Sequence, residues 1–187
     1  MTPQPPANRP KGSALIVRIM GNSPARTIDL LPLSQHEAAM VAAGKPGDGD
    51  RWAEGFPREL DRAPCARLAH AAQDPRPFGV YRIVPLTHGL TIGTAGFYGP
   101  LDASGQVTIG YGMVEPEWGK GYGTEAVAGL IEVCRAHGGV VTVNADTDTD
   151  NIGSQRVLEK NGFRRVRTTG GLCYYTLRLR RLGQRIN

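Results

Sequence analysis

The sequence lacks any long hydrophobic run: no segment approaches the roughly 18 apolar residues that a membrane-spanning helix needs. The apolar stretch at residues 14–20 is interrupted by Arg18, and no small-residue cleavage site follows it. We therefore expect neither a membrane span nor a signal peptide, and we expect the protein to be cytoplasmic.

Cysteine is scarce as well. The three cysteines, Cys65, Cys134 and Cys173, are odd in number and far apart, and they show neither a CxxC motif nor the Cys/His spacing of a zinc site. This pattern argues against a disulfide scaffold and predicts free thiols in a reducing compartment. We expect no metal cofactor.

Acidic residues are missing from residues 164–187, which hold seven arginines and therefore carry a charge of +7. Because the net charge of the chain is +5, the remainder carries −2. We interpret the segment as a basic terminal strand and tail. Attraction to an anionic ligand or to RNA stays open as an alternative, but this charge pattern alone does not predict nucleic-acid binding.

Turn-forming residues are abundant, with 25 glycines and 14 prolines and no collagen-like period, and 40% of the residues are hydrophobic. The Pro-rich stretch at residues 1–13 is expected to be a disordered tail, and residues 14–187 are expected to form one globular domain. Its class is predicted to be α+β (mixed α/β), with antiparallel strands followed by one strand–helix–strand crossover. Predicted strands cover residues 14–20, 25–33, 78–86, 90–99, 106–114, 140–146, 163–168 and 172–181, and predicted helices cover 34–44, 58–73, 124–139 and 151–162.

Three glycines alternate in the sequence EPEWGKGYGTEA, directly before the amphipathic helix predicted at residues 124–139. The first N–H groups of a helix lack internal partners and lie at the positive end of its dipole, so glycines there let a phosphate approach. Lys120 adds a cation at the same place. A tight turn that needs positive φ is the structural alternative.

A dinucleotide site is a second phosphate-binding alternative, since residues 121–126 match G-x-G-x-x-A and Asp146 follows at a plausible distance. Four residues separate the preceding strand from the first glycine, however, and only about 40 residues follow Asp146, which is too few for the second half of a doubly wound sheet. The Walker A pattern GxxxxGK[ST] is absent.

Residues 109–163 resemble the acyl-CoA-binding core of the GNAT N-acetyltransferases, in particular the ribosomal-protein (RimJ/RimL-like) branch. The segments GKGYGTEA and DNIGSQRVLEKNGF, at their observed separation, carry this resemblance. It implies a GNAT-like twisted, mostly antiparallel sheet of six to seven strands that is splayed at its centre and flanked by about four helices.

The resemblance also implies a site for acetyl-CoA. The pantetheine arm is expected to pair with the strand at Met113 and Val114, where Gly110 and Gly112 fit a bulge that opens the slot, and Asn151 is expected to face the arm or simply to cap its helix. The pyrophosphate is expected on the loop residues Gly119, Lys120, Gly121, Tyr122, Gly123 and Thr124.

The catalytic groups depart from the family pattern. Leu158 stands where many members have a tyrosine that protonates the leaving thiolate, so Ser154 or water is the expected acid. Asn144 stands about where other members have a glutamate, and can orient a water molecule. Glu115 and Asp146 are the nearest carboxylates, and an amide near Val114 is expected to hold the oxyanion.

Trp118 replaces the usual Arg or Gln of the glycine loop. The predicted function is acetyl-CoA-dependent N-acetyl transfer, directly to a primary amine: a protein or peptide amino terminus, a polyamine or an aminosugar. A non-catalytic acyl-CoA-binding regulatory protein of the same fold, and an RNA- or ribosome-associating module, remain alternatives.

The family places the acceptor walls at about residues 44–73 and 168–175. The acid-rich stretch at residues 47–61 suits a cationic acceptor, and Trp52 and Phe56 could line the acceptor site or belong to the core. A homodimer is expected by family analogy only.

Overall fold

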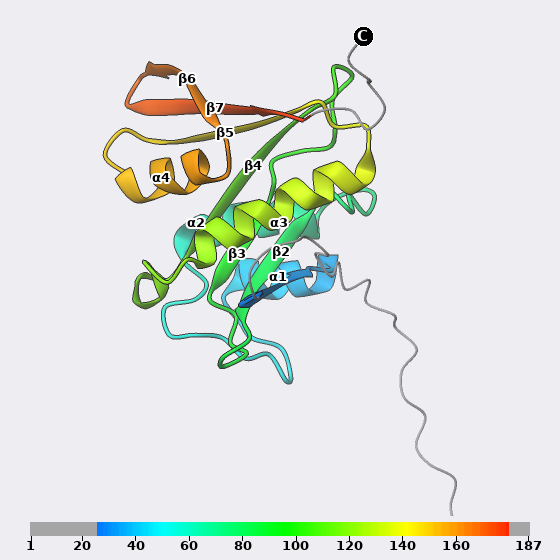
Figure 1. Ribbon diagram of the computed structural model, residues 1–187. Helices are drawn as coiled ribbons and strands as arrows, with labels where there is room; N and C mark the ends of the chain where they lie inside the picture. The colour runs from blue at the N-terminus through cyan, green and yellow to red at the C-terminus, as the bar shows by residue number, and fades with distance from the viewer. Residues whose placement is uncertain (1–25, 180–187) are drawn as a thin grey trace, which may run out of the picture.

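The computed structural model describes residues 26–179, which form one seven-stranded sheet with four α-helices (Figure 1). The strand order is β1-β2-β3-β4-β5-β7-β6, and neighbouring strands are antiparallel except for the parallel pair β4–β5. The predicted tail at residues 1–13 and the predicted strand at 14–20 lie outside the described residues. The strands are β1 Ile28–Pro32, β2 Val80–Pro85, β3 Gly93–Phe97, β4 Gln106–Met113, β5 Thr142–Asp148, β6 Arg164–Thr169 and β7 Leu172–Arg178.

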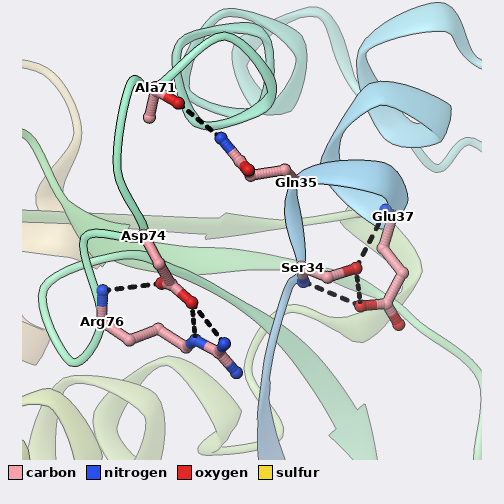
Figure 2. Close-up of polar contacts among 6 residues, drawn as sticks. All are labelled: Ser34, Gln35, Glu37, Ala71, Asp74 and Arg76. Atoms are coloured by element: carbon pink, nitrogen blue, oxygen red, sulfur yellow. Dashed lines mark hydrogen bonds and ion pairs between the residues drawn. The ribbon is translucent and has the colours of Figure 1, made fainter.

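Helix α1 (Gln35–Ala43) begins and ends where its sequence indicates. Figure 2 shows that the Ser34 hydroxyl accepts a hydrogen bond from the Glu37 N–H, while the Glu37 carboxylate accepts one from the Ser34 N–H. This reciprocal capping box satisfies two N–H groups that the helix itself leaves free. Gly44 ends the helix at φ 67°, in the left-handed conformation that favours glycine.

Helix α2 (Glu59–Ala69) packs against α1 and continues through Pro64. The Gln35 amide donates a hydrogen bond of 2.6 Å to the carbonyl of Ala71, just beyond α2 (Figure 2). An ion pair between Arg76 and Asp74 closes the loop that follows. These contacts fix the start of α1 to the end of α2 and stabilise the loop that leads from α2 to β2.

Helix α3 (Tyr122–His137) crosses the sheet on the face opposite to α1 and α2 (Figure 1). Its buried stripe includes Ala126, Val127, Leu130 and Cys134, as the three- and four-residue spacing of the sequence predicts. Helix α4 (Ile152–Lys160) lies near α3 and β5. No helix within residues 26–179 is long and apolar enough to cross a bilayer.

The sheet opens in its middle. Strand β4 pairs with β5 only through residues 106–108, opposite residues 142–144, whereas it pairs with β3 through residues 109–113. The expected central splay is confirmed, but the expected bulge is wrong: the β3–β4 register runs through Gly110 and Gly112 without a shift. The gap forms because β5 diverges after its third paired residue.

Candidate functional site

The glycine loop turns the chain from the end of β4 into α3. A short 3₁₀ turn, Glu115–Glu117, follows the strand, and Gly119 and Gly121 then adopt φ values of 75° and 88°. Both glycines adopt the left-handed conformation, so the turn interpretation is confirmed for Gly119 and Gly121, whereas Gly123 belongs to α3. A Cβ atom built on either glycine would meet no atom within 4 Å, so the space in front of the loop is open.

The first turn of α3 presents unpaired amides to this space. Gly121 is the N-cap and supplies no side-chain cap, and the N–H of Glu125 makes the first i→i−4 bond, to the Gly121 carbonyl (3.1 Å). The three preceding N–H groups therefore have no helical acceptor. These groups belong to Tyr122, Gly123 and Thr124.

The charged side chains near the loop already have partners. Lys120 Nζ lies 3.1 Å from Glu117 and remains half exposed, so its ammonium group stays at the loop. Glu125, in the first turn of α3, accepts hydrogen bonds from the backbone of Thr27 and Ile28. Its negative charge is thus used to fix the start of β1, away from the open space.

Only every second residue of β4 directs its backbone N–H and C=O groups at β3, and the residues between them direct theirs at the gap. The Val114 N–H donates to Ile92 O (2.9 Å), and the Tyr98 N–H donates to Thr108 O (2.9 Å), so even-numbered residues of β4 point their polar groups at β3. Tyr111 and Met113 consequently direct theirs toward the gap beside β5. The Val114 N–H is thus already paired, so an oxyanion donor near Val114 would have to be the neighbouring Met113 N–H or that of Tyr111.

Trp118 closes one end of this free edge. Its indole Nε1 donates a hydrogen bond of 2.9 Å to the carbonyl of Met113, while 60% of the side chain stays exposed. The residue that replaces the usual Arg or Gln thus binds the strand rather than the loop.

Tyr111 projects from β4 toward α3 and α4. Its hydroxyl oxygen is buried and makes no hydrogen bond within the described part of the chain. Burial raises the pKa of Tyr111 above its ordinary value, and the neighbouring Ser154 side chain opposes this rise. The sequence interpretation missed this residue, although the alternation of Ile109, Tyr111 and Met113 in β4 could have placed it on the helix-covered face.

The predicted catalytic residues are not brought into one cluster. Asn144 lies beside Thr108 in the β4–β5 pairing, on the α2 side of the sheet, and donates a hydrogen bond of 3.1 Å to Gln106. Ser154 lies near Tyr111 on the other side, and Glu115 is exposed in the turn after β4. Asn151 caps α4 by accepting the Ser154 N–H (3.0 Å).

A cleft of about 380 Å³ lies between α2 and strands β3 and β4, on the face opposite to α3. Gly110 lines the cleft, and Gly112 lies against Arg58, which lines it too. A Cβ on Gly110 would lie 2.6 Å from the Tyr98 hydroxyl, and one on Gly112 would lie 2.3 Å from the Arg58 guanidinium. These glycines therefore make room for two side chains. Residues lining the cleft include Arg58, Ala63, Arg67, Thr94, Gly96 and Tyr98.

Arg58 is held in place by a carboxylate with no solvent exposure. Asp61 accepts hydrogen bonds from the Arg58 backbone N–H (2.9 Å), from its Nε (3.0 Å) and Nη2 (2.8 Å), and from the Thr94 hydroxyl (2.6 Å). The guanidinium is therefore fixed against β4 at one end of the cleft. Arg67, at the other end, lies 5.7 Å from the centre of the Tyr98 ring.

The lining of the cleft overlaps one of the two ranges expected to form the acceptor walls. It draws on residues 58–67, within the first expected range, and on none of residues 168–175. Its charged residues are Arg58, Glu59 and Arg67, so the acid-rich composition of the neighbouring loop does not extend into the cleft. Trp52 and Phe56 pack edge-to-face with centroids 5.2 Å apart and join the hydrophobic core.

All three cysteines are free and buried, and the described residues contain no group of three or more His, Cys, Asp or Glu side chains placed to hold a metal ion.

Comparison with known proteins identifies the sequence pattern. The sequence model of the acetyltransferase (GNAT) domain matches residues 28–164. A curated relative, the uncharacterized N-acetyltransferase YjdG of Bacillus subtilis (strain 168), is 38% identical over 72 residues. That alignment covers 38% of this chain and 43% of the relative, so the chain matches less than half of that protein's length.

Solved structures share the fold at low identity. The ribosomal-protein-S5-alanine acetyltransferase of Vibrio fischeri superposes with a TM-score of 0.59 at 16% identity, covering 83% of this chain and 95% of that one. The aminoglycoside acetyltransferase AAC(6')-Ib, in complex with coenzyme A, superposes with a TM-score of 0.55 at 22% identity, covering 81% and 95%. Both likenesses concern the fold alone.

Proposed function

The chain belongs to the GNAT acetyltransferase family, a family of acyltransferases, and we propose that it transfers an acetyl group from acetyl-CoA directly to a primary amine. The observation that carries the proposal is the uncapped first turn of α3. Its three amides have no acceptor within the 16-residue helix and lie at its positive end, and the space beside Gly119 and Gly121 in the preceding loop is open.

The residues present fit the pyrophosphate and pantetheine of CoA. The amides of residues 122–124 and the ammonium of Lys120 would hold the pyrophosphate, and the backbone at Tyr111 and Met113 would pair with the amides of the arm. Gly123 belongs to the same turn. Bound acetyl-CoA supplies the activated thioester.

The chain's own groups then position the reaction. An N–H of Tyr111 or Met113, pointing into the gap, is placed to donate a hydrogen bond to the carbonyl oxygen of the thioester. Asn144, on the α2 side, would orient a water molecule that takes a proton from the amine, because an amide cannot itself act as a base. Glu115 lies beyond the far end of β4 from Thr108, the partner of Asn144, so the proton would leave this site through water rather than to Glu115.

The cleft between α2 and β3 is the proposed acceptor site. It meets β4 at Gly110 and Tyr111, beside the gap, so an amine in the cleft would approach the thioester from the face opposite to α3. A protein or peptide amino terminus of the RimJ/RimL type, a polyamine and an aminosugar remain the candidate acceptors, and Arg58 and Arg67 would disfavour the highly cationic ones.

Titration calorimetry with acetyl-CoA tests the first half of the proposal. We expect a single site, and no heat at tens of micromolar acetyl-CoA would refute the proposal. A panel of amines from the three classes, followed by thiol detection of released CoA, tests the second half. Tight binding with no acceleration for any amine would instead favour the non-catalytic acyl-CoA-binding alternative.

A further inference from the structure

The cleft between α2 and strands β3 and β4 contains a positive charge that no carboxylate within residues 26–179 balances. Of its two arginines, Arg58 is neutralised by the buried Asp61 carboxylate, which accepts hydrogen bonds from Nε and Nη2. The exposed Glu59 carboxylate lies 3.6 Å from Arg62. The Arg67 side chain makes no hydrogen bond or ion pair in the described part of the chain, so its charge is available to a ligand.

The Arg67 guanidinium has an aromatic ring as its neighbour. Its Cζ lies 5.7 Å from the centre of the Tyr98 ring, and both side chains are exposed in the cleft. A guanidinium beside a ring keeps its N–H donors free, and these donors form a fork that matches the two oxygens of a carboxylate. Arg67 is therefore a ready-made carboxylate site on the wall of the cleft.

Tyr98 connects this charge to the part of β4 that borders the gap. A Cβ atom built on Gly110 would lie 2.6 Å from the Tyr98 hydroxyl oxygen, so the ring reaches the floor of the cleft at Gly110. Gly110 follows Thr108, the last residue of β4 that pairs with β5. A small acceptor with its amine beside Gly110 therefore has Arg67 within reach of its other end.

One face of α2 gives the cleft a largely apolar wall. Four residues at helical spacing line the cleft, and three of them are apolar: Leu60, Ala63, Pro64 and Arg67. Leu60 is 79% exposed and Tyr98 is 58% exposed, although both are large side chains. An apolar group placed in the cleft would cover them and gain the free energy of removing that surface from water.

We propose that the acceptor is a small amine that carries one carboxylate and an apolar body, the composition of a hydrophobic α-amino acid. This inference rests on the proposed function and names its acceptor. Arg67 binds the carboxylate, Leu60 and Tyr98 cover the apolar body, and the amine lies beside Gly110. The amine nitrogen forms a bond to the thioester carbon, the carbon–sulfur bond breaks, and the proton that nitrogen loses ends on the CoA thiol.

Charge and volume favour this class of acceptor over the others. A polyamine or an aminosugar brings several ammonium groups to a cleft that already holds an unbalanced positive charge, and like charges repel. A phosphate group carries nearly two negative charges at neutral pH, more than the single free arginine balances. The volume of about 380 Å³ lies at the small end of the range for ligand pockets, which suits a compact acceptor.

Calorimetry on protein saturated with CoA isolates the contact with the carboxylate. N-acetyl-leucine and N-acetyl-leucinamide differ only in that group, and neither has an ionisable amine. The wild type should bind the acid about tenfold more tightly, the lower end of the range for a hydrogen bond to a charged group, because Arg67 is exposed. Arg67→Met keeps the length of the side chain without its charge, and should bind the two within about twofold.

Arg62→Met is the matched control. It removes the same charge from the same helix, but Arg62 donates to the carbonyl of Ala42 and does not line the cleft. It should keep the tenfold preference for the acid. Equal preferences in the two variants would overturn the inference, because general electrostatic attraction would then account for the binding.

Leu60→Ala tests the apolar wall. In CoA-saturated protein, it should reduce the preference for N-acetyl-leucine over N-acetylglycine by about fourfold, the equivalent of one methylene group no longer buried. An unchanged preference would overturn the placement of the apolar body against this wall.

Turnover separates the acceptor from the proposed function. With acetyl-CoA, kcat/KM for leucine should exceed that for spermidine and for O-phosphoethanolamine by at least about tenfold. A wild type that prefers either of those amines, or that binds N-acetyl-leucine and its amide equally, overturns the inference and leaves the proposed function standing. Protein that binds no acetyl-CoA, or that releases CoA with no amine, refutes the proposed function itself.

Discussion

Gly121→Ala provides a sharp test of the helix N-terminus because the structure supplies a matched control on the same helix. Gly121, the N-cap of α3, has φ 88°, and Gly138, the C-cap, has φ 73°. A Cβ atom on either glycine would meet no atom within 4 Å. The two alanine variants therefore carry the same kind of cost, backbone strain, at opposite ends of one helix.

The strain sets the expected loss of stability. An L-residue in the left-handed region costs roughly 1–2 kcal/mol. For a domain of this size, 1 kcal/mol shifts the melting temperature by about 2–4 °C. Differential scanning calorimetry should thus show both Gly121→Ala and Gly138→Ala melting about 2–8 °C below the wild type.

Affinity for acetyl-CoA should separate the two variants. A hydrogen bond to a charged group contributes about 1.5–3 kcal/mol, so losing one phosphate contact weakens binding by about 10- to 150-fold. We expect this loss for Gly121→Ala, whose methyl group and altered backbone disturb the first amides, and wild-type affinity for Gly138→Ala. Equal affinities of the two variants, whether both intact or both reduced, would refute the reasoning that the first turn of α3 holds the phosphate.

Two further predictions concern buried titratable groups. Asp61→Asn should lower the free energy of unfolding by about 3 kcal/mol in urea titrations, the lower end of the range for breaking a buried ion pair, because it leaves the partly exposed Arg58 guanidinium without its counter-charge; a change within experimental error would contradict this account. Alkaline pH should also destabilise the protein. Burial raises the thiol pKa values of Cys65 and Cys134 to about 12, so above pH about 9 the unfolded thiols ionise while the folded ones do not. The stability present below pH about 9 is then lost progressively up to pH about 12, and Cys134→Ala should flatten that decline; a pH-independent urea midpoint between pH 8 and 11 would contradict it.

Much of the fold followed from short-range patterns. Ser34 and Gly44 fixed the ends of α1 because capping depends on neighbouring residues, and the apolar stripe of α3 followed from helical periodicity alone. The turn at Gly119 and Gly121 and the start of α3 could likewise be predicted, because both depend on neighbouring residues alone.

The parts that failed depend on partners distant in sequence. Gly110 and Gly112 suggested a bulge, but their small size makes room for Tyr98 and for Arg58, which lies more than 50 positions earlier in the chain. The pairing of the Val114 N–H could not be read without the β3–β4 register, which decides which residues point at the gap. Tyr111 was missed for a different reason, because the alternation of side chains along β4, a local pattern, was not applied to it.

The divergence of β5 from β4 gives the sheet a third edge, in its interior. Outer edges of sheets are exposed to pairing with other chains, and proteins protect them with charges, bulges or coverings. Here the backbone at Tyr111 and Met113 forms such an edge between two otherwise complete half-sheets, and the Trp118 indole covers a single carbonyl of it. A ligand arm carrying its own amide groups would act as the missing strand, so its occupancy completes the hydrogen-bonded surface that the polypeptide leaves unfinished.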